Sequence, residues 1–247
     1  MRVTLAPSWR GTAVRCRTTT DRNARPCYFR PVTTATASPH TKGERTRQTI
    51  VDHGVATAYR IGLGRLTIGE LATSTGLSKS GLYAHFGSKE TLQLAVLDEA
   101  ATRFTDAVIR PALQAPRGEP RLRALFDRWV RSGTAREPGV CLFVKAATEL
   151  DEQPGPVRDR LAAHHRALIA TIETVVRTSD GGFRADADGR QVAADLYGVM
   201  LSFYLSHRLL RDSAAEHHAR TTFEALLAAL APAPSPTCPD HATGNRP

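Results

Sequence analysis

The chain has 247 residues, of which 41% are hydrophobic and 23% charged, and it carries a net charge of +9 with a pI of about 9.9. These values are ordinary for one large or two small globular domains, and no apolar run approaches the ~18 residues that span a bilayer. The basic charge favours an acidic partner, either nucleic acid or an anionic membrane surface.

Residues 1–40 hold most of this charge. They contain seven arginines and a single acidic residue, Asp21, which leaves a net charge of +3 for the rest of the chain. The segment is also rich in Thr, Ala and Pro and has no periodicity. Its composition fits an organellar transit peptide, but it lacks an amphipathic helix and the apolar run of a secretory signal. We expect a disordered basic extension, or residues translated upstream of the true start. The Pro-rich residues 232–247 are expected to be a disordered tail.

Nearly all of the sequence between these tails has helical periodicity, and no alternating strand pattern competes with it, so we predict an all-α fold. The first helix places Ile50, Val55 and Ala58 on one side. A long helix that begins near Glu90 is expected to end at Arg110, because Pro111 cannot continue it.

Two short helices with a tight corner follow the first helix. Thr67 and Glu70 have the spacing of a capping box, in which each side chain bonds the backbone N–H of the other residue. A helix over about Ile68–Ser74 is therefore predicted. Gly76 then supplies the left-handed conformation that the corner requires.

Ser78 is an N-cap for the next helix, over about Lys79–His85. Two short helices across a glycine corner form a helix-turn-helix, whose second helix enters the major groove of DNA. Gly81 lets the backbone of this helix come close to DNA. Lys89 lies in the first turn of a third helix, capped by Ser88, where backbone N–H groups favour a phosphate.

The run LTIGELATSTGLSKSGLYAHFGSKETL, preceded by AYRIG, closely resembles the DNA-binding domain of TetR-type transcriptional repressors. The matching positions are Tyr59, Gly62, Thr67, Leu71, Ala72, Gly76, Leu82, Tyr83, His85, Phe86, Ser88, Lys89 and Leu92. The match covers about residues 45–95, and the remainder agrees in layout only. The resemblance implies a DNA-binding domain over residues 41–90 and a helical effector-binding and dimerisation domain over residues 91–231.

The resemblance also implies which side chains face DNA: Thr67, Ser78, Lys79, Ser80, Tyr83, His85 and Lys89. Of these, we interpret Thr67, Tyr83, His85 and Lys89 as phosphate contacts, which position the protein without specifying sequence. Lys79 and Ser80 are the candidate base readers, because lysine suits the guanine acceptors. Lys42 and Arg45 are expected to add phosphate contacts from the start of the first helix.

Two further sets of residues are assigned to the C-terminal part. Five residues could line an effector pocket, although packing in the core would explain their apolar character equally well. They are Phe104, Phe126, Trp129, Phe143 and Leu168. The terminal helices carry apolar stripes that suit either the core or, as we favour, a dimer interface: Val192, Leu196, Val199, Phe203, Phe223, Leu226 and Leu230.

No metal, cofactor or catalytic site is expected. The DADG motif at residues 186–189 resembles part of a calcium loop but lacks the closing Glu, so a simple interhelical loop is favoured. The pairs His164–His165 and His217–His218 are adjacent in sequence, so their side chains diverge by about 100° on a helix. The four cysteines (Cys16, Cys27, Cys141 and Cys238) form no CxxC motif and are expected to be free thiols.

We therefore expect a cytoplasmic, non-enzymatic repressor that binds a palindromic double-stranded DNA operator as a homodimer and is released by an unknown small-molecule effector, with no membrane partner. One alternative is a DNA-binding regulator without an effector. Another is a helical enzyme whose basic surface binds an acidic substrate, although no nucleophile–base pair, paired carboxylates or metal-ligand cluster supports it.

Overall fold

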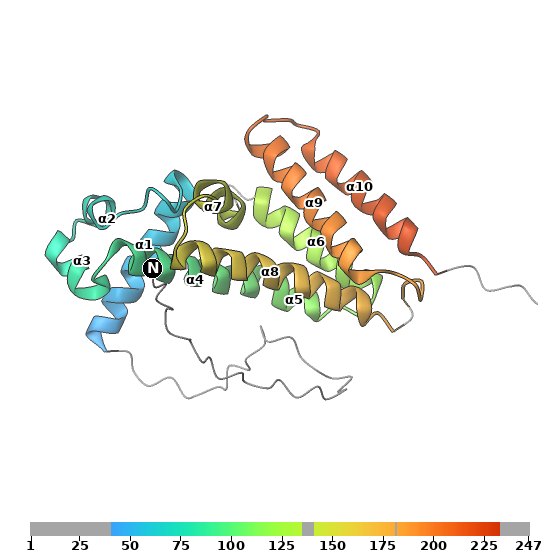
Figure 1. The fold of residues 1–247 in the computed structure, drawn as a ribbon, viewed down its shortest axis with the longest axis horizontal. Helices are drawn as coiled ribbons and strands as arrows, with labels where there is room; N and C mark the ends of the chain where they lie inside the picture. The colour runs from blue at the N-terminus through green and yellow to red at the C-terminus, as the bar shows by residue number, and fades with distance from the viewer. Residues whose placement is uncertain (1–40, 135–140, 181, 233–247) are drawn as a thin grey trace, which may run out of the picture. The chain divides into compact units, whose positions relative to one another are not determined.

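The computed structural model describes residues 41–134, 141–180 and 182–232, and these ranges contain helices but no strand (Figure 1). The predicted all-α fold is thus confirmed. The predicted extension over residues 1–40 and nearly all of the predicted tail lie outside the described residues.

The helices follow one another in this order: α1 Lys42–Ile61, α2 Ile68–Thr75, α3 Lys79–Phe86, α4 Lys89–Phe104, the π-helix η1 Thr105–Ile109, α5 Arg110–Leu113, α6 Glu119–Thr134, α7 Leu142–Leu150, α8 Pro156–Arg177, α9 Gly189–Arg208 and α10 Ala215–Leu230. Helices α8 and α9 pack against each other, as do α9 and α10, whereas α1 packs against α2 and α4.

The N-caps predicted for the helix-turn-helix are confirmed. The hydroxyl oxygens of Thr67, Ser78 and Ser88 each accept a hydrogen bond from the backbone N–H three residues later, at 3.0, 3.1 and 3.0 Å. Gly76 adopts the left-handed conformation, with φ of 70°, at the corner between α2 and α3. Each of these short helices therefore starts and stops where local side-chain and backbone chemistry directs it.

The complete capping box lies at the start of α1 rather than at Thr67. Thr41 Oγ1 accepts from the Glu44 N–H at 3.2 Å, and the Glu44 carboxylate accepts from the Thr41 N–H at 2.7 Å. At Thr67 only the hydroxyl half of the predicted box is present, because Glu70 makes no return bond to the described Thr67 N–H. Thr67 caps α2 without this second bond.

The expected helix end at Pro111 is wrong. The chain stays helical through η1 and α5 as far as Leu113. Within η1 the Arg110 N–H bonds the Thr105 carbonyl, five residues back, and Pro111 occupies one of the first two positions of α5. The wider turn lets the helix restart, and a proline near a helix start loses no intrahelical bond.

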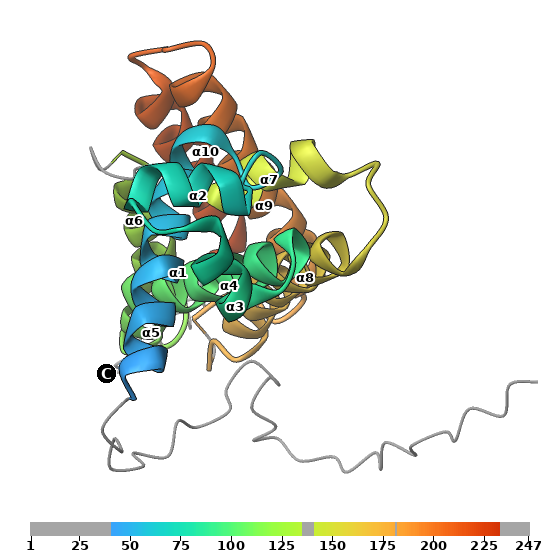
Figure 2. The same ribbon diagram turned by 90° about the vertical axis from the view of Figure 1, so that its left-hand side faces the viewer.

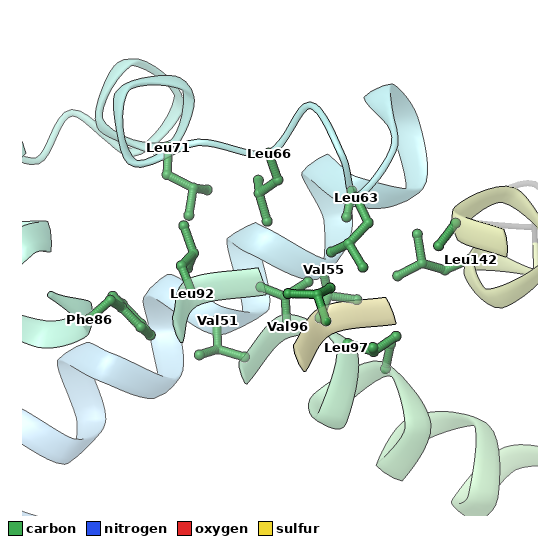
Figure 3. Close-up of a cluster of buried hydrophobic side chains, with 14 of the residues drawn as sticks. Val51, Val55, Leu63, Leu66, Leu71, Phe86, Leu92, Val96, Leu97 and Leu142 are labelled. Carbon is green, nitrogen blue, oxygen red and sulfur yellow. The ribbon is translucent and has the colours of Figure 1, made fainter. Parts of the chain in front are cut away.

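A first hydrophobic core joins α1, α2, α3 and α4 to α7 and the beginning of α8. In Figure 3 the side chain of Leu71 points toward Leu92, those of Val55 and Val96 lie together at the centre, and Leu142 of α7 approaches from the right. The DNA-binding helices therefore share apolar packing with a helix that lies far away in the sequence.

A second core lies among η1, α6, α8, α9 and α10, and it corrects the predicted dimer interface. Five of the residues assigned to that interface are at most 5% exposed within the single chain: Val192, Leu196, Phe203, Phe223 and Leu230. Val199 and Leu226 are partly buried against the same core. The apolar stripes of α9 and α10 pack in the same core as α6 and α8, so these five side chains are core residues of the chain itself.

Candidate nucleic-acid interface

The recognition helix α3 has one buried face and one exposed face. Leu82 and Phe86 are 0% and 4% exposed and attach α3 to the first core. The opposite face is polar, with Lys79 and Ser80 exposed and Tyr83 54% exposed. Figure 2 shows α2 and α3 from this side of the protein. The helix thus presents its polar N-terminal turn to a partner while its apolar residues fix its orientation.

Lys79 and Ser80, the candidate base readers, lie side by side in the first turn of α3. Ser80 Oγ is 3.2 Å from Ser78 Oγ, so the cap hydroxyl restrains the second serine. Within the part of the chain that the structure describes, no carboxylate forms a salt bridge with Lys79. A lysine ammonium and a serine hydroxyl at the start of a recognition helix match the acceptors at a guanine edge.

The phosphate-contact candidates on α3 differ in exposure. More than half of the Tyr83 side chain is exposed, so its ring packs less than we expected and its hydroxyl is accessible. His85 is half-buried beside the Phe86 ring, with ring centroids 6.4 Å apart. Thr67 is half-buried, and its hydroxyl caps α2.

Lys89 has an internal hydrogen bond as well as an exposed position. Its Nζ donates to the Gly64 carbonyl oxygen at 2.8 Å, in the connection between α1 and α2. An ammonium has three hydrogens, so this bond leaves Nζ able to contact a phosphate. The residue lies in the first turn of α4, which Ser88 caps.

Lys42 and Arg45 are exposed in the first turns of α1. The Arg47 guanidinium lies 5.0 Å from the centre of the Phe86 ring, which places this part of α1 beside the end of α3. Arg47 is not among the predicted DNA contacts. No local signal identifies it, because its aromatic partner lies two helices further along the chain.

The candidate effector residues occupy different environments. Phe126 and Trp129 belong to the second core, where Phe126 stacks on Phe223 with centroids 4.1 Å apart. Phe104 and Phe143 meet edge to face with centroids 6.1 Å apart. Leu168 is partly buried against the second core. The structure therefore brings Phe104 and Phe143 together but does not gather all five residues at one place.

His165, one of the adjacent histidines considered in the sequence, lies next to Phe143 and is hydrogen-bonded. His165 Nε2 lies 3.2 Å from the Phe143 carbonyl oxygen, and the Tyr197 hydroxyl bonds His165 Nδ1. Burial lowers the pKa of His165 and raises the pKa of Tyr197 to about 12. Because a carbonyl only accepts, Nε2 carries the hydrogen, and the neutral ring accepts from Tyr197 at Nδ1.

A groove of about 260 Å³ runs between α9 and α10. It is lined by Gly198, Val199, Ser202, Phe203, Ser206, Ala215, His218, Ala219 and Thr222. Two residues of the predicted dimer interface, Val199 and Phe203, thus reach this surface, although Phe203 is 3% exposed.

The DADG segment forms an interhelical loop, as predicted, and Asp188 caps α9 by accepting from the Arg190 N–H at 2.9 Å.

Cys141 is a free thiol, and burial raises its pKa, whereas the other three cysteines lie outside the described residues. No cluster of three potential metal ligands occurs among the residues that the structure describes. Within the same residues, no helix has the length and apolarity to cross a bilayer.

Two family models match the chain. Residues 50–96 match the description "Bacterial regulatory proteins, tetR family", and residues 118–223 match "Tetracyclin repressor-like, C-terminal domain". None of the curated protein sequences matches the chain.

Solved structures with the same fold include a TetR-family transcriptional regulator from Cytophaga hutchinsonii, with a TM-score of 0.70 at 18% identity over 78% of this chain and 98% of that one. A TetR transcriptional regulator from Chloroflexus aurantiacus has a TM-score of 0.65 at 29% identity over 76% of this chain and 94% of that one. AibR, solved in complex with isovaleryl coenzyme A and operator DNA, has a TM-score of 0.56 at 20% identity over 71% of this chain and 96% of that one. Because family models match both the helix-turn-helix and the C-terminal helices on one all-α fold, the chain belongs to the TetR family of transcriptional regulators.

Proposed function

We propose that the protein is a non-enzymatic cytoplasmic repressor that binds a palindromic operator as a homodimer and releases it when a small molecule binds the C-terminal domain. The observation that carries this proposal is the polar, exposed first turn of α3 on a fully capped helix-turn-helix. Lys79 and Ser80 are proposed to read bases, while Tyr83, Lys89 and the first turns of α1 contact phosphates.

Dimerisation is proposed because one recognition helix reads too few base pairs to select a genomic site. The groove between α9 and α10 supports an interface there, since Gly198 and Ser202 allow close approach of a second helix pair. Leu205 at the end of α9 is 48% exposed and extends the apolar part of this surface. The interface that we propose therefore uses the outward faces of α9 and α10, and the core residues behind them support it.

Effector control is proposed from the C-terminal family match and from the AibR complex, which holds both isovaleryl coenzyme A and operator DNA. The edge-to-face pair Phe104 and Phe143 supports an effector site near the contact between the two cores. A coupling of about 1–3 kcal/mol between ligand and DNA binding is sufficient for such control.

The test is a titration of the purified protein with DNA that flanks its own gene, followed by fluorescence anisotropy and footprinting. We expect protection of a two-fold symmetric site at a stoichiometry of two chains. Random DNA of the same length is the control. Equal affinity for both DNAs at physiological salt would reject a sequence-specific regulator, and an operator affinity that no candidate ligand changes would reject effector control.

A further inference from the structure

The connection between α1 and α2 is held by two side chains of α7. Lys145 Nζ donates to the carbonyl oxygens of Arg60 and Tyr59 at 3.0 and 3.4 Å, at the end of α1. The Glu149 carboxylate accepts from the Gly64 N–H at 2.9 Å. We call Lys145 and Glu149 the α7 clasp, since these two residues, one helical turn apart, bond the end of α1 and the connection that follows it.

The charges of the clasp match what they contact. The last carbonyls of a helix have no intrahelical partner and carry the negative end of its dipole, so the Lys145 ammonium is favourably placed. The Glu149 carboxylate in turn accepts from a backbone N–H that follows the helix. Both are charge-assisted hydrogen bonds, which are shorter and stronger than neutral ones.

Gly62 makes room for the clasp. Its φ is 98°, and a Cβ atom built on it would lie 1.9 Å from Glu149 Oε1. The carboxylate thus occupies the space that a side chain at position 62 would need. The adjoining face of α7 is fixed too, because Leu142, Ala146 and Leu150 are at most 5% exposed in the first core. The connection consequently has one position relative to α7.

The other end of α7 is bound to the C-terminal helices. The carbonyl of Phe143 accepts from His165 of α8, which in turn accepts from the Tyr197 hydroxyl of α9. Hydrogen bonds therefore link α9 to α8 and α8 to α7, and the α7 backbone joins Phe143 to Lys145, which bonds the end of α1. Side-chain packing and such bonds between rigid helices are the physical means by which one part of a protein positions another.

We propose that Lys145 and Glu149 are positioning residues for DNA binding, which hold the helix-turn-helix in one orientation on the C-terminal domain and thereby set the distance between the two recognition helices of the dimer. This inference rests on the proposed function. The clasp acts through the α1–α2 connection and contacts no base itself.

The helix-turn-helix keeps its own support when the clasp is removed. Gln93 Nε2 of α4 donates to the Leu63 carbonyl at 2.6 Å and to the Leu66 carbonyl at 3.4 Å, and Lys89 Nζ bonds Gly64. These contacts hold the same connection from within the DNA-binding helices. Without the clasp, the helix-turn-helix is therefore expected to stay folded but to take up more than one orientation relative to the C-terminal domain.

The experiment uses the full chain and the double variant Lys145→Met/Glu149→Ala. The operator is selected from random DNA with the wild-type protein. Affinity is then measured for this operator, for versions with one or two base pairs added to or removed from its centre, and for a single half-site. Lys145→Arg/Glu149→Gln keeps a hydrogen-bond donor at position 145 and an acceptor at position 149. The variant Glu152→Ala/Arg166→Met removes two exposed charges that have no contact with the connection.

We expect the wild type to discriminate strongly between the spacings. In Lys145→Met/Glu149→Ala this preference should fall by on the order of tenfold, while half-site affinity stays at the wild-type level. The conservative variant should recover the preference at least in part, and the Glu152/Arg166 control should match the wild type. Hydrogen exchange in α2 and α3 should not change.

Two results would overturn the inference: an unchanged spacing preference in Lys145→Met/Glu149→Ala, or an equal loss on half-site and full operator, which would make the clasp a mere stabiliser of the helix-turn-helix. A wild-type protein that selects no two-half-site operator is a different outcome. It would reject the proposed function, and with it the inference.

Discussion

At the scale of single residues, the proposed DNA-facing surface has some side chains suited to reading bases and others suited to contacting phosphates. Lys79 is exposed and lies in the first turn of the recognition helix, whereas Tyr83 lies one turn later with 54% of its side chain exposed. In the proposed DNA complex the first turn of α3 enters the major groove, so its contacts depend on base identity. The contact proposed between the Tyr83 hydroxyl and a phosphate does not depend on base identity.

Replacing Lys79 by Ala should change sequence preference by about 1–3 kcal/mol at one base pair of each half-site. Replacing Tyr83 by Phe should weaken binding to operator and random DNA by the same factor, since it removes only a hydroxyl. Anisotropy titrations against a panel of single-base operator variants measure both effects. Equal losses on operator and random DNA for Lys79→Ala would refute its assignment as a base reader.

Replacing Gly62 by Ala should destabilise the protein by about 1–3 kcal/mol, because φ is positive there and the new Cβ meets the Glu149 carboxylate. Urea unfolding at neutral pH measures the change in the free energy of unfolding. In a Glu149→Ala background the cost should be smaller, since only the backbone strain remains. Gly43→Ala, in the exposed first turn of α1, serves as the control and should be neutral or stabilising. Additive effects of Gly62→Ala and Glu149→Ala would argue against a shared contact.

At the scale of secondary-structure elements, α7 is a short helix that contacts the helix-turn-helix through the first core and α8 through a hydrogen bond. Its apolar face completes the first core, its Lys145 and Glu149 hold the end of α1, and its Phe143 carbonyl receives the His165 bond. Nine residues thus connect three parts of the protein. His165 of α8 is the residue among these contacts whose ordinary pKa lies near neutral pH.

The His165 contacts predict a pH dependence of stability. Burial lowers the pKa of His165, as does the neighbouring His164, although the Phe143 carbonyl opposes the shift. A base whose pKa is lower in the folded state stabilises the fold fully above the unfolded value of about 6.5. This stability is lost as the pH falls from about 6.5 toward the lower folded pKa.

Urea unfolding between pH 7.5 and 5 should therefore show a decline in the free energy of unfolding that is smaller in His165→Gln. His164 is bonded to Asp98, which Arg160 also contacts, so His164→Gln is the matched control for the neighbouring position. Identical pH profiles for wild type and His165→Gln would show that His165 does not titrate in the range considered.

At the scale of the whole molecule, ion pairs hold α10 against α6 and so decide which face of α10 is left for a partner. Arg123 of α6 bonds the Glu224 carboxylate, and Arg220 of α10 bonds Asp127 at 2.6 Å. The Glu224 pairing raises the pKa of Arg123 and lowers that of Glu224. Because this side of α10 packs against α6, the groove between α9 and α10 lies on the outer surface of the chain.

Replacing Ser202 by Arg should block the proposed dimer, because a charged side chain would fill the groove between α9 and α10. Sedimentation velocity should show a shift from dimer to monomer, accompanied by loss of operator affinity but retention of helical content by circular dichroism. Thr102→Arg adds the same charge to the exposed surface of α4 and should remain a dimer. If the Ser202→Arg variant is still a dimer, the interface does not lie at the groove between α9 and α10.

The sequence by itself determined the helix-turn-helix. Its caps at Thr67, Ser78 and Ser88 and its corner at Gly76 depend on groups at most four residues apart, so short-range chemistry fixes where α2, α3 and α4 begin. The family resemblance came from the same stretch, because the residues that form these caps and this corner are also the ones that match the TetR pattern. Helical periodicity likewise gave the all-α fold.

Tertiary structure alone decided which partner each apolar stripe covers. Periodicity shows that a helix has an apolar face but not what lies against it, and the stripes of α9 and α10 that suited a dimer cover α6 and α8 instead. The α7 clasp was equally hidden, because Lys145 and Glu149 meet backbone atoms of residues 59–64 that no sequence spacing relates to them. Such contacts depend on how whole helices pack, and a single sequence records only the residues that make that packing possible.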